Sequence, residues 1–384
     1  MSTLLKVHKL SLKTFCQMNN REITGNIGEW SEIYTLLKLL GEGKVYAGDQ
    51  NLEKIKNLVY PIIMIIRQEK EGVYDYLVSN ADIVIQKADG TELLRLSAEK
   101  FLHEAEYLLS AMQNKPAGAR SFSVAKTQAF MDKIYCSTLK ASSSDKTDIH
   151  IVLHDQRTRM NNNLGFSIKS QLGGDSTLLN ASGATNFTYK VVGADFSDEE
   201  IENINAIATR TKIIDRVDAV RRKGAELQFD HVDNSIFRSN LAMMDNGLAP
   251  TIAQLLVEQF NTGERTFSNL IKPLAESNPL GFDMDDKEDV YIYKLKHLLT
   301  SAALGMMPSK KWTGRYDANG GYLVVKKDGE ILCYHFYDKN RFEDFLFANA
   351  YLERGKTHRH GYASLYRGED GCVYFKLNLQ IRLK

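Results

Sequence analysis

Residues 165–170 read GFSIKS, and residues 147–151 read TDIHI. Both runs have the apolar and β-branched content of short strands. The first nevertheless carries Lys169 where an apolar side chain would be buried at less cost, and Asp148 stands at the start of the second. An acid and an amine on what should be neighbouring strands indicate that this part of the sheet borders a cleft rather than a core.

The chain around this pair predicts an α/β fold with a central mixed sheet flanked by helices. The periodicity of apolar residues predicts helices over 29–43, 97–113 (with Ser97 as its cap), 122–139, 290–307 and 341–352, and an almost wholly helical stretch over 198–275. Predicted strands cover 58–66, two strands within 74–96 with a turn at Asp89-Gly90, a hairpin over 320–337 with its turn at Asp328-Gly329, and a closing strand over 372–384.

This order of elements suggests three segments. Residues 1–196 form a core that carries the two strands, residues 197–307 are mainly helical, and residues 308–384 form a small α+β unit. Residues 277–289, which combine Pro279 with an acidic cluster, mark a seam inside this arrangement.

Composition excludes several classes of protein. The formal net charge is only +1, and the cysteines at 16, 136, 333 and 372 form no CxxC pair, so neither a zinc ribbon nor a disulfide framework is indicated. Reduced thiols, the lack of a secretory signal, and the lack of an apolar run near the ~18 residues of a membrane helix favour a cytoplasmic protein without membrane contact.

Asp148 and Lys169 are the residue types needed to hydrolyse a phosphodiester. A carboxylate can bind Mg²⁺, which prefers oxygen ligands, and the metal lowers the pKa of a bound water. A lysine can position that water or stabilise charge that develops in the transition state. The alternative is structural, because Asp148 can simply begin a strand while Lys169 faces solvent.

A second carboxylate is needed, and the usual place for it, two residues before the lysine, holds Ser167. Glu29 and Glu32 lie three residues apart on one face at the start of a predicted helix, and either could reach over the strands. Asp155 and Asp175 are rivals. Negative charge at the start of a helix is also favoured by the helix dipole alone, so a purely structural role for both glutamates stays open.

The runs GEWSEIYTLLKLL, TDIHIVLHDQ, GFSIKSQLGGDSTLLNASGATNFTY and YFKLNLQIR resemble the HpaII-type family of type II restriction endonucleases, within the PD-(D/E)xK nuclease superfamily. The resemblance runs from about residue 27 to residue 382. It implies a nuclease core, Mg²⁺ as cofactor, double-stranded DNA as partner, and Asp148 and Lys169 at the superfamily's Asp and Lys positions. Thr147 replaces the usual proline and Ser167 the usual acid, so Glu29, and then Glu32, become the expected second metal ligand.

Two groups of residues are predicted to contact DNA. The polar stretch after Lys169 supplies short side chains that can reach phosphates or base edges, although the same residue types also favour turns; these are Ser170, Asn180, Ser182, Thr185 and Asn186. Residues 309–384 hold 14 Lys and Arg against nine Asp and Glu. Their densest basic runs contain Lys310, Lys311, Arg315, Arg354, Lys356, His358, Arg359 and His360, for which a solvated surface is the alternative.

The expected function is therefore Mg²⁺-dependent cleavage of duplex DNA at a short palindrome, with a CCGG-like target implied by the resemblance. A palindrome favours a two-fold homodimer, although a monomer can also nick one strand at a time. A DNA-binding protein with a decayed nuclease core, favoured by Ser167, is the first alternative. A repair or modification-dependent nuclease is the second.

Overall fold

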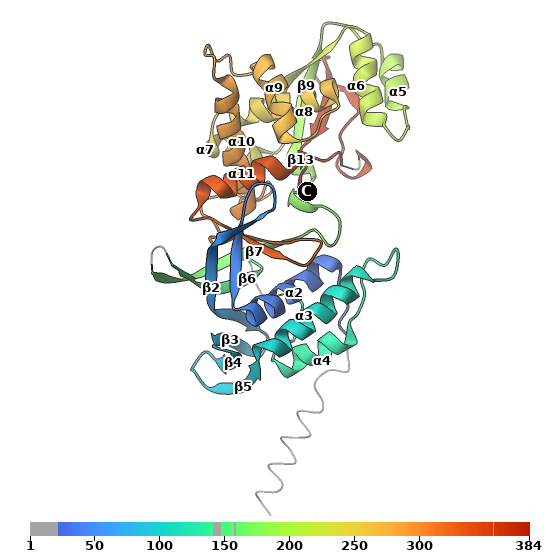
Figure 1. Cartoon of the computed structure of the whole chain (residues 1–384). Coiled ribbons are helices and arrows are strands. Elements are labelled where there is room, and N and C mark those ends of the chain that lie inside the picture. The colour runs from blue at the N-terminus through green and yellow to red at the C-terminus, as the bar shows by residue number, and fades with distance from the viewer. Residues whose placement is uncertain (1–21, 141–146, 157–158, 356) are drawn as a thin grey trace, which may run out of the picture.

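Two hydrophobic cores organise the molecule (Figure 1). The computed structural model describes residues 22–140, 147–156, 159–355 and 357–384. One core is built from the N-terminal half together with a later hairpin, and the other from the helical second half. Figure 1 shows these halves one above the other, with the C-terminus between them.

Four strands of the N-terminal half and the two strands of a later hairpin close into a barrel. β1 pairs with β12 in parallel and with β2 in antiparallel fashion, so the order β1-β12-β11-β7-β6-β2 returns on itself. β2 then runs on to pair with β3, and β4 and β5 continue the sheet. The strands are β1 (Lys44–Gly48), β2 (Lys54–Glu69), β3 (Gly72–Ser79), β4 (Asp82–Lys87), β5 (Glu92–Ser97), β6 (Ile149–Asp155), β7 (Met160–Ser170), β11 (Gly321–Val325) and β12 (Ile331–His335).

The predicted α/β class and mixed sheet are thus confirmed, but the sheet is a closed barrel and not specifically a PD-(D/E)xK sheet. Its closure depends on the hairpin β11–β12, which the sequence analysis placed in the C-terminal unit. The hairpin turns at the predicted Asp328-Gly329, where Gly329 has φ 86°. β11 lies parallel to β7, and the side chains at its odd-numbered positions, Leu323 and Val325, belong to the N-terminal core.

Three helices pack beside the barrel: α2 (Ile27–Glu42), α3 (Ala98–Gln113) and α4 (Ala125–Lys133). α2 contacts both α3 and β7 and carries the fully buried Trp30. It begins with a capping box between Asn26 and Glu29 and ends at Gly43, which has φ 63°. The helix predicted over 29–43 is therefore confirmed.

The second half contains a four-stranded sheet, β10-β9-β15-β14, and a three-stranded sheet, β13-β16-β8. Its strands are β8 (Ser176–Leu179), β9 (Asn186–Val192), β10 (Glu226–Val232), β13 (Ala350–Leu352), β14 (Leu365–Arg367), β15 (Val373–Asn378) and β16 (Ile381–Leu383). Its helices are α5 (Asp198–Asn205), α6 (Lys212–Arg222), α7 (Ser235–Met244), α8 (Leu248–Thr262), α9 (Phe267–Ser277), α10 (Lys287–Leu304) and α11 (Lys339–Asn349).

Several predicted elements differ from the structure. β10 interrupts the stretch predicted as helical, because Leu227 and Phe229 alternate with polar residues and pack on the second core. The closing strand is two strands in different sheets, and the stretch 74–96 is three strands with a turn at Asn80, φ 54°. α4 is shorter than predicted, and Ser97 makes no side-chain capping bond.

Candidate active site

The structure brings Asp148 and Lys169 together through Ser167. The Ser167 hydroxyl donates to Asp148 Oδ2 at 2.9 Å and accepts from Lys169 Nζ at 3.0 Å. The backbone N–H of Ile168 donates to the same carboxylate oxygen at 2.7 Å. The acid and the amine therefore meet on one side of the sheet, where a single phosphate could contact both.

The pleat of β7 explains why a lysine occupies this strand. Phe166 and Ile168 point into the N-terminal core, whereas Ser167 and Lys169 point to the opposite face. There Lys169 Nζ lies 4.8 Å from the ring centre of Tyr322, a buried residue of β11. Burial lowers the pKa of the Lys169 amine, while the carboxylates of Asp148 and Glu32 raise it. The lysine thus lies in a partly desolvated site between acids, not on a solvated face.

A cavity of about 370 Å³ opens over this pair. One wall holds Asp148, Ser167 and Lys169, and another holds Asn180 and Ser182, which the sequence analysis predicted to contact DNA. The end of α10 and the residues after it form the remaining wall, with Ala302, Ala303, Met306 and Ser309. Five of the predicted site residues therefore line the same cavity.

The two candidate glutamates have different surroundings. Glu29 Oε2 accepts from the Asn26 backbone at 2.8 Å, and Glu29 Oε1 lies 3.2 Å from Lys140 Nζ, in a cavity that does not include Asp148. Burial, followed by repulsion from Asp148, raises the pKa of Glu32 from 4.5 to about 8. Glu32 thus shares an electrostatic environment with Asp148 and Lys169, and this coupling favours it over Glu29.

The rival carboxylates lie elsewhere. Asp155 is buried at the far end of β6 from Asp148. Asp175 Oδ2 accepts a hydrogen bond from the Tyr351 hydroxyl at 2.6 Å, on the loop after β7. Neither lines the cavity over Asp148.

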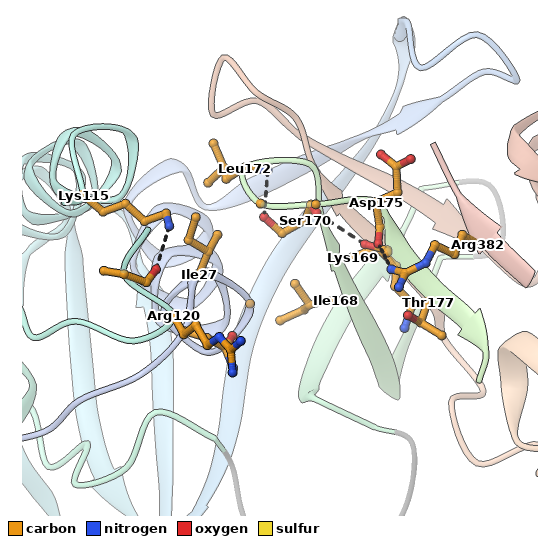
Figure 2. Close-up of a pocket in the computed structure, with 16 residues that line it drawn as sticks. Ile27, Lys115, Arg120, Ile168, Lys169, Ser170, Leu172, Asp175, Thr177 and Arg382 are labelled. Carbon is orange, nitrogen blue, oxygen red and sulfur yellow. Dashed lines mark hydrogen bonds between the residues drawn. The ribbon is translucent and has the colours of Figure 1, made fainter. Parts of the chain in front are cut away.

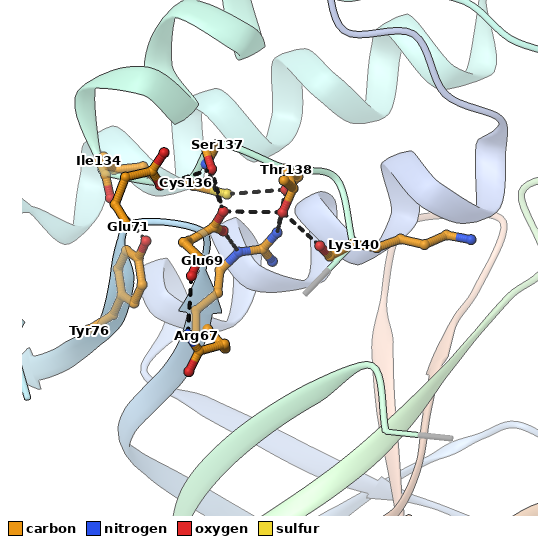
Figure 3. A network of polar contacts seen from close by, with 10 residues as sticks. Arg67, Glu69, Glu71, Tyr76, Ile134, Cys136, Ser137, Thr138 and Lys140 are labelled. Carbon is orange, nitrogen blue, oxygen red and sulfur yellow. Dashed lines mark hydrogen bonds and ion pairs between the residues drawn. The ribbon is translucent and has the colours of Figure 1, made fainter. Parts of the chain in front are cut away.

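Figure 3 shows a network of polar contacts around Arg67 and Glu69, both of which are buried. Arg67 of β2 forms an ion pair with Glu69 and donates to the Thr138 carbonyl. Glu69 Oε2 accepts from the Ser137 hydroxyl at 2.6 Å and from Thr138 Oγ1 at 3.1 Å. These bonds fix Ser137 and Thr138, which lie just before Lys140 in the chain. Lys140 and Arg67 both lower the pKa of Glu32, which partly offsets the effect of its burial.

The other predicted DNA contacts are scattered. Thr185 and Asn186 are buried and bonded within the protein, to Ser182 and Asn378 respectively, which favours the turn-forming alternative for them. Ser170 accepts from the Ser31 hydroxyl of α2 at 2.8 Å.

Among the basic residues, exposed side chains near Ser309 belong to Lys310, Lys311 and Arg315. Arg354 lines a separate cavity with Arg210 and Lys212. Arg359 is exposed and His360 half-buried near it in the chain. Lys356 and the side chain of His358 lie outside the described residues.

Sequence reasoning missed three cations beside the active site. Lys115, Arg120 and Arg382 line a second cavity together with Lys169 (Figure 2). Lys115 and Arg120 belong to the turn after α3, which carries no charge cluster and no motif, so no signal in the sequence marked them.

The donor atoms fit a magnesium ion. In the part of the chain that the structure describes, no group of three or more His, Cys, Asp and Glu residues is gathered as metal ligands. Mg²⁺ in phosphoryl-transfer sites typically takes only one or two carboxylates, with water and substrate phosphate as its other ligands. Burial first, and then repulsion from Asp148, raise the pKa of Glu32, so the two carboxylates interact electrostatically and could serve as the protein's ligands to such an ion.

An acid and a lysine that converge at a cavity are the pair expected of a phosphodiester hydrolase, and comparison with known proteins shows which class of hydrolase this is. The family model described as HpaII restriction endonuclease matches residues 26–383. The type II restriction enzyme HpaII of Haemophilus parainfluenzae is 40% identical over 359 residues, which cover 94% of this chain and 98% of that enzyme. No solved structure gives a significant match.

The chain is a type II site-specific deoxyribonuclease. It belongs to the HpaII restriction endonuclease family. None of the helices in the described residues is both long and apolar enough to span a bilayer.

Proposed function

We propose that this endonuclease cleaves double-stranded DNA at a short palindrome in a Mg²⁺-dependent reaction. The observation that carries the proposal is the convergence of Asp148 Oδ2 and Lys169 Nζ on Ser167 Oγ, with Glu32 in the same electrostatic environment. This convergence supports a PD-(D/E)xK-type catalytic pair, carried here on antiparallel strands of a barrel.

Asp148 and Glu32 would hold the metal. Bound Mg²⁺ supplies neutralisation of phosphate charge and a lowered pKa of a water ligand. Ser167 keeps the Asp148 carboxylate and the Lys169 amine in fixed relative positions. Lys169 contributes an N–H donor and, when protonated, a positive charge at the phosphate, in a site where burial strengthens both effects.

The proposal also assigns residues that contact DNA, a target sequence and an oligomeric state. Asn180 and Ser182 face the catalytic pair across the cavity, and the exposed Lys310, Lys311 and Arg315 follow Ser309 at its rim, so we assign them to phosphate or base contact. Of the three segments predicted, residues 308–384 would thus supply contacts as well as barrel strands. A CCGG-like target is supported by the 40% identity to HpaII. A homodimer would match a palindrome, and a DNA substrate together with free Cys136, Cys333 and Cys372 suits the cytoplasm.

The test is digestion of plasmid DNA by the purified protein, with Mg²⁺ and with EDTA. We expect discrete fragments only with Mg²⁺, and sequencing of their ends gives the target and the cut position. Tight binding without cleavage under all metals would instead support the decayed nuclease. Cleavage only of methylated DNA, or only of damaged DNA, would support the modification-dependent or repair enzyme.

A further inference from the structure

A second cavity, of about 800 Å³, adjoins the active site (Figure 2). Lys169 and Thr177 line both cavities, so the second cavity, called the trough below, adjoins the first at the end of β7. The walls come from distant parts of the chain: the start of α2, the turn after α3, and the loop 172–177 together with Arg382 of β16. Figure 2 shows Lys115 and Arg120 on one side of the trough and Arg382 on the other.

The charge of this cavity is strongly unbalanced. It is lined by Lys115, Arg120, Lys169 and Arg382 but by a single acid, Asp175, whose carboxylate already accepts from Tyr351. Arg382 lies 3.6 Å from a Glu353 carboxylate oxygen. Lys115 Nζ donates to the backbone carbonyl of Ala119 at 2.9 Å. Within the described ranges, neither Lys115 nor Arg120 forms an ion pair with an acid. Their positive charge is thus available to an anionic ligand.

Gly174 lines the trough without a side chain, although nothing in the structure requires a glycine at this position. A Cβ atom at Gly174 would have no atom within 4 Å, and the residue does not adopt a positive φ. Neither packing nor backbone conformation therefore calls for glycine at this position. A missing side chain does allow a ligand to approach the backbone closely.

We propose that this trough receives the sugar–phosphate backbone of DNA next to the scissile phosphate, with Lys115 and Arg120 bound to phosphates. A polyanion is the ligand that suits a row of cations leading to the catalytic lysine. The inference rests on the proposed function, since it assigns a second contact surface to the same substrate.

The experiment measures DNA binding by fluorescence anisotropy, without Mg²⁺, over a range of KCl concentrations. In Lys115→Gln/Arg120→Gln the side chains stay polar while two positive charges are lost. Each phosphate contact contributes about 0.9 to the salt dependence of log K, so the slope should fall by roughly 2 and affinity by roughly 50-fold at about 0.1 M salt. Non-specific DNA should lose affinity by the same factor, because backbone contacts carry no sequence information.

Lys100→Gln/Lys133→Gln is the matched control. Both lysines are exposed, on α3 and at the end of α4, and neither is among the residues lining the trough. The control should bind as the wild type does. A second variant, Gly174→Leu, should fold normally because its Cβ meets open space, yet bind DNA weakly. Circular dichroism and thermal melts check the fold of each variant.

Neutral methylphosphonates placed one at a time along the duplex locate the contacts. Positions that weaken binding of the wild type should become silent in the Lys115/Arg120 variant. Unchanged affinity and slope in that variant, or an equal loss in the control, would overturn the inference while wild-type cleavage still stands. A wild-type protein that cuts no DNA with any metal would instead overturn the proposed function.

Discussion

The substitution Glu32→Gln should abolish cleavage and stabilise the metal-free protein, whereas Glu29→Gln should do neither. Glu32 shares its surroundings with Asp148, and burial and repulsion raise its pKa to about 8. Glu29 serves the capping box of α2, a role that glutamine also fills. The two substitutions are chemically identical and lie three residues apart on one helix, so each controls for the other.

The size of the stability effect follows from proton linkage. At pH 7 the Glu32 carboxyl is largely protonated in the folded protein, while in the unfolded chain, with a pKa of 4.5, it is ionised. Holding that proton costs the fold about 1.36 kcal/mol for each of the roughly 2.5 pH units between 4.5 and 7, or about 3 kcal/mol. Because the folded pKa of an acid is raised, the cost is small near pH 4.5, grows as pH rises, and levels off above about 8. Glu32→Gln removes this cost.

Urea unfolding in EDTA at several pH values measures the difference. The stability gained by Glu32→Gln should be under about 1 kcal/mol at pH 5 and reach about 3 kcal/mol at pH 7. Plasmid cleavage with Mg²⁺ should fall at least ~100-fold, from the several kcal/mol that a metal supplies. A stability difference that does not change with pH, or an inactive Glu29→Gln beside an active Glu32→Gln, would refute the assignment.

Two further substitutions test the catalytic strand. Lys169→Met keeps the apolar stem over Tyr322 and removes the amine, so cleavage should fall by ~10²–10³ while DNA affinity changes only a few-fold; gel-based rates and anisotropy separate the two, and retained cleavage would reject the role. Gly165→Ala would place a Cβ 2.7 Å from Thr147 Cγ2 and should cost about 1–3 kcal/mol of unfolding free energy. Adding Thr147→Ala should recover part of that cost in a double-mutant cycle, and strict additivity would show that this contact is not its cause.

Local patterns predicted most helices and hairpins of this fold, because their signals are local. α2, with its glycine stop, and the hairpin at Asp328-Gly329 follow from spacing and turn chemistry alone. Barrel closure could not be predicted in this way. It depends on β12 pairing in parallel with β1, almost 300 residues away in sequence. The sequence of neither strand indicates which other strand it pairs with.

The active site divides in the same way. The convergence of Asp148 and Lys169 could be predicted from a charged residue in each of two short apolar runs, taken together with the family resemblance. The choice between Glu29 and Glu32 could not, because both lie in the first turns of one helix. Tertiary packing separates them, because Glu29 forms an ion pair with Lys140 whereas Glu32 is more buried and is repelled by Asp148. Lys115 and Arg120 line the trough because α3 packs on α2. The sequence around these two residues contains no motif that indicates this packing.

The serine at position 167 and the glutamate at position 32 can be understood together. An acid at 167 would stand within hydrogen-bonding distance of Asp148, since the serine hydroxyl lies 2.9 Å from its carboxylate. It would be a third negative charge in a site where repulsion already contributes to the raised pKa of Glu32. A neutral hydroxyl avoids that repulsion and still joins Asp148 to Lys169. The second carboxylate then comes from α2, which is held in place by Trp30 and by the bond between Ser31 and Ser170. On the proposed mechanism the metal site therefore exists only when α2 is packed against the barrel, so variants that loosen this helix should lose Mg²⁺-dependent cleavage before they lose the fold.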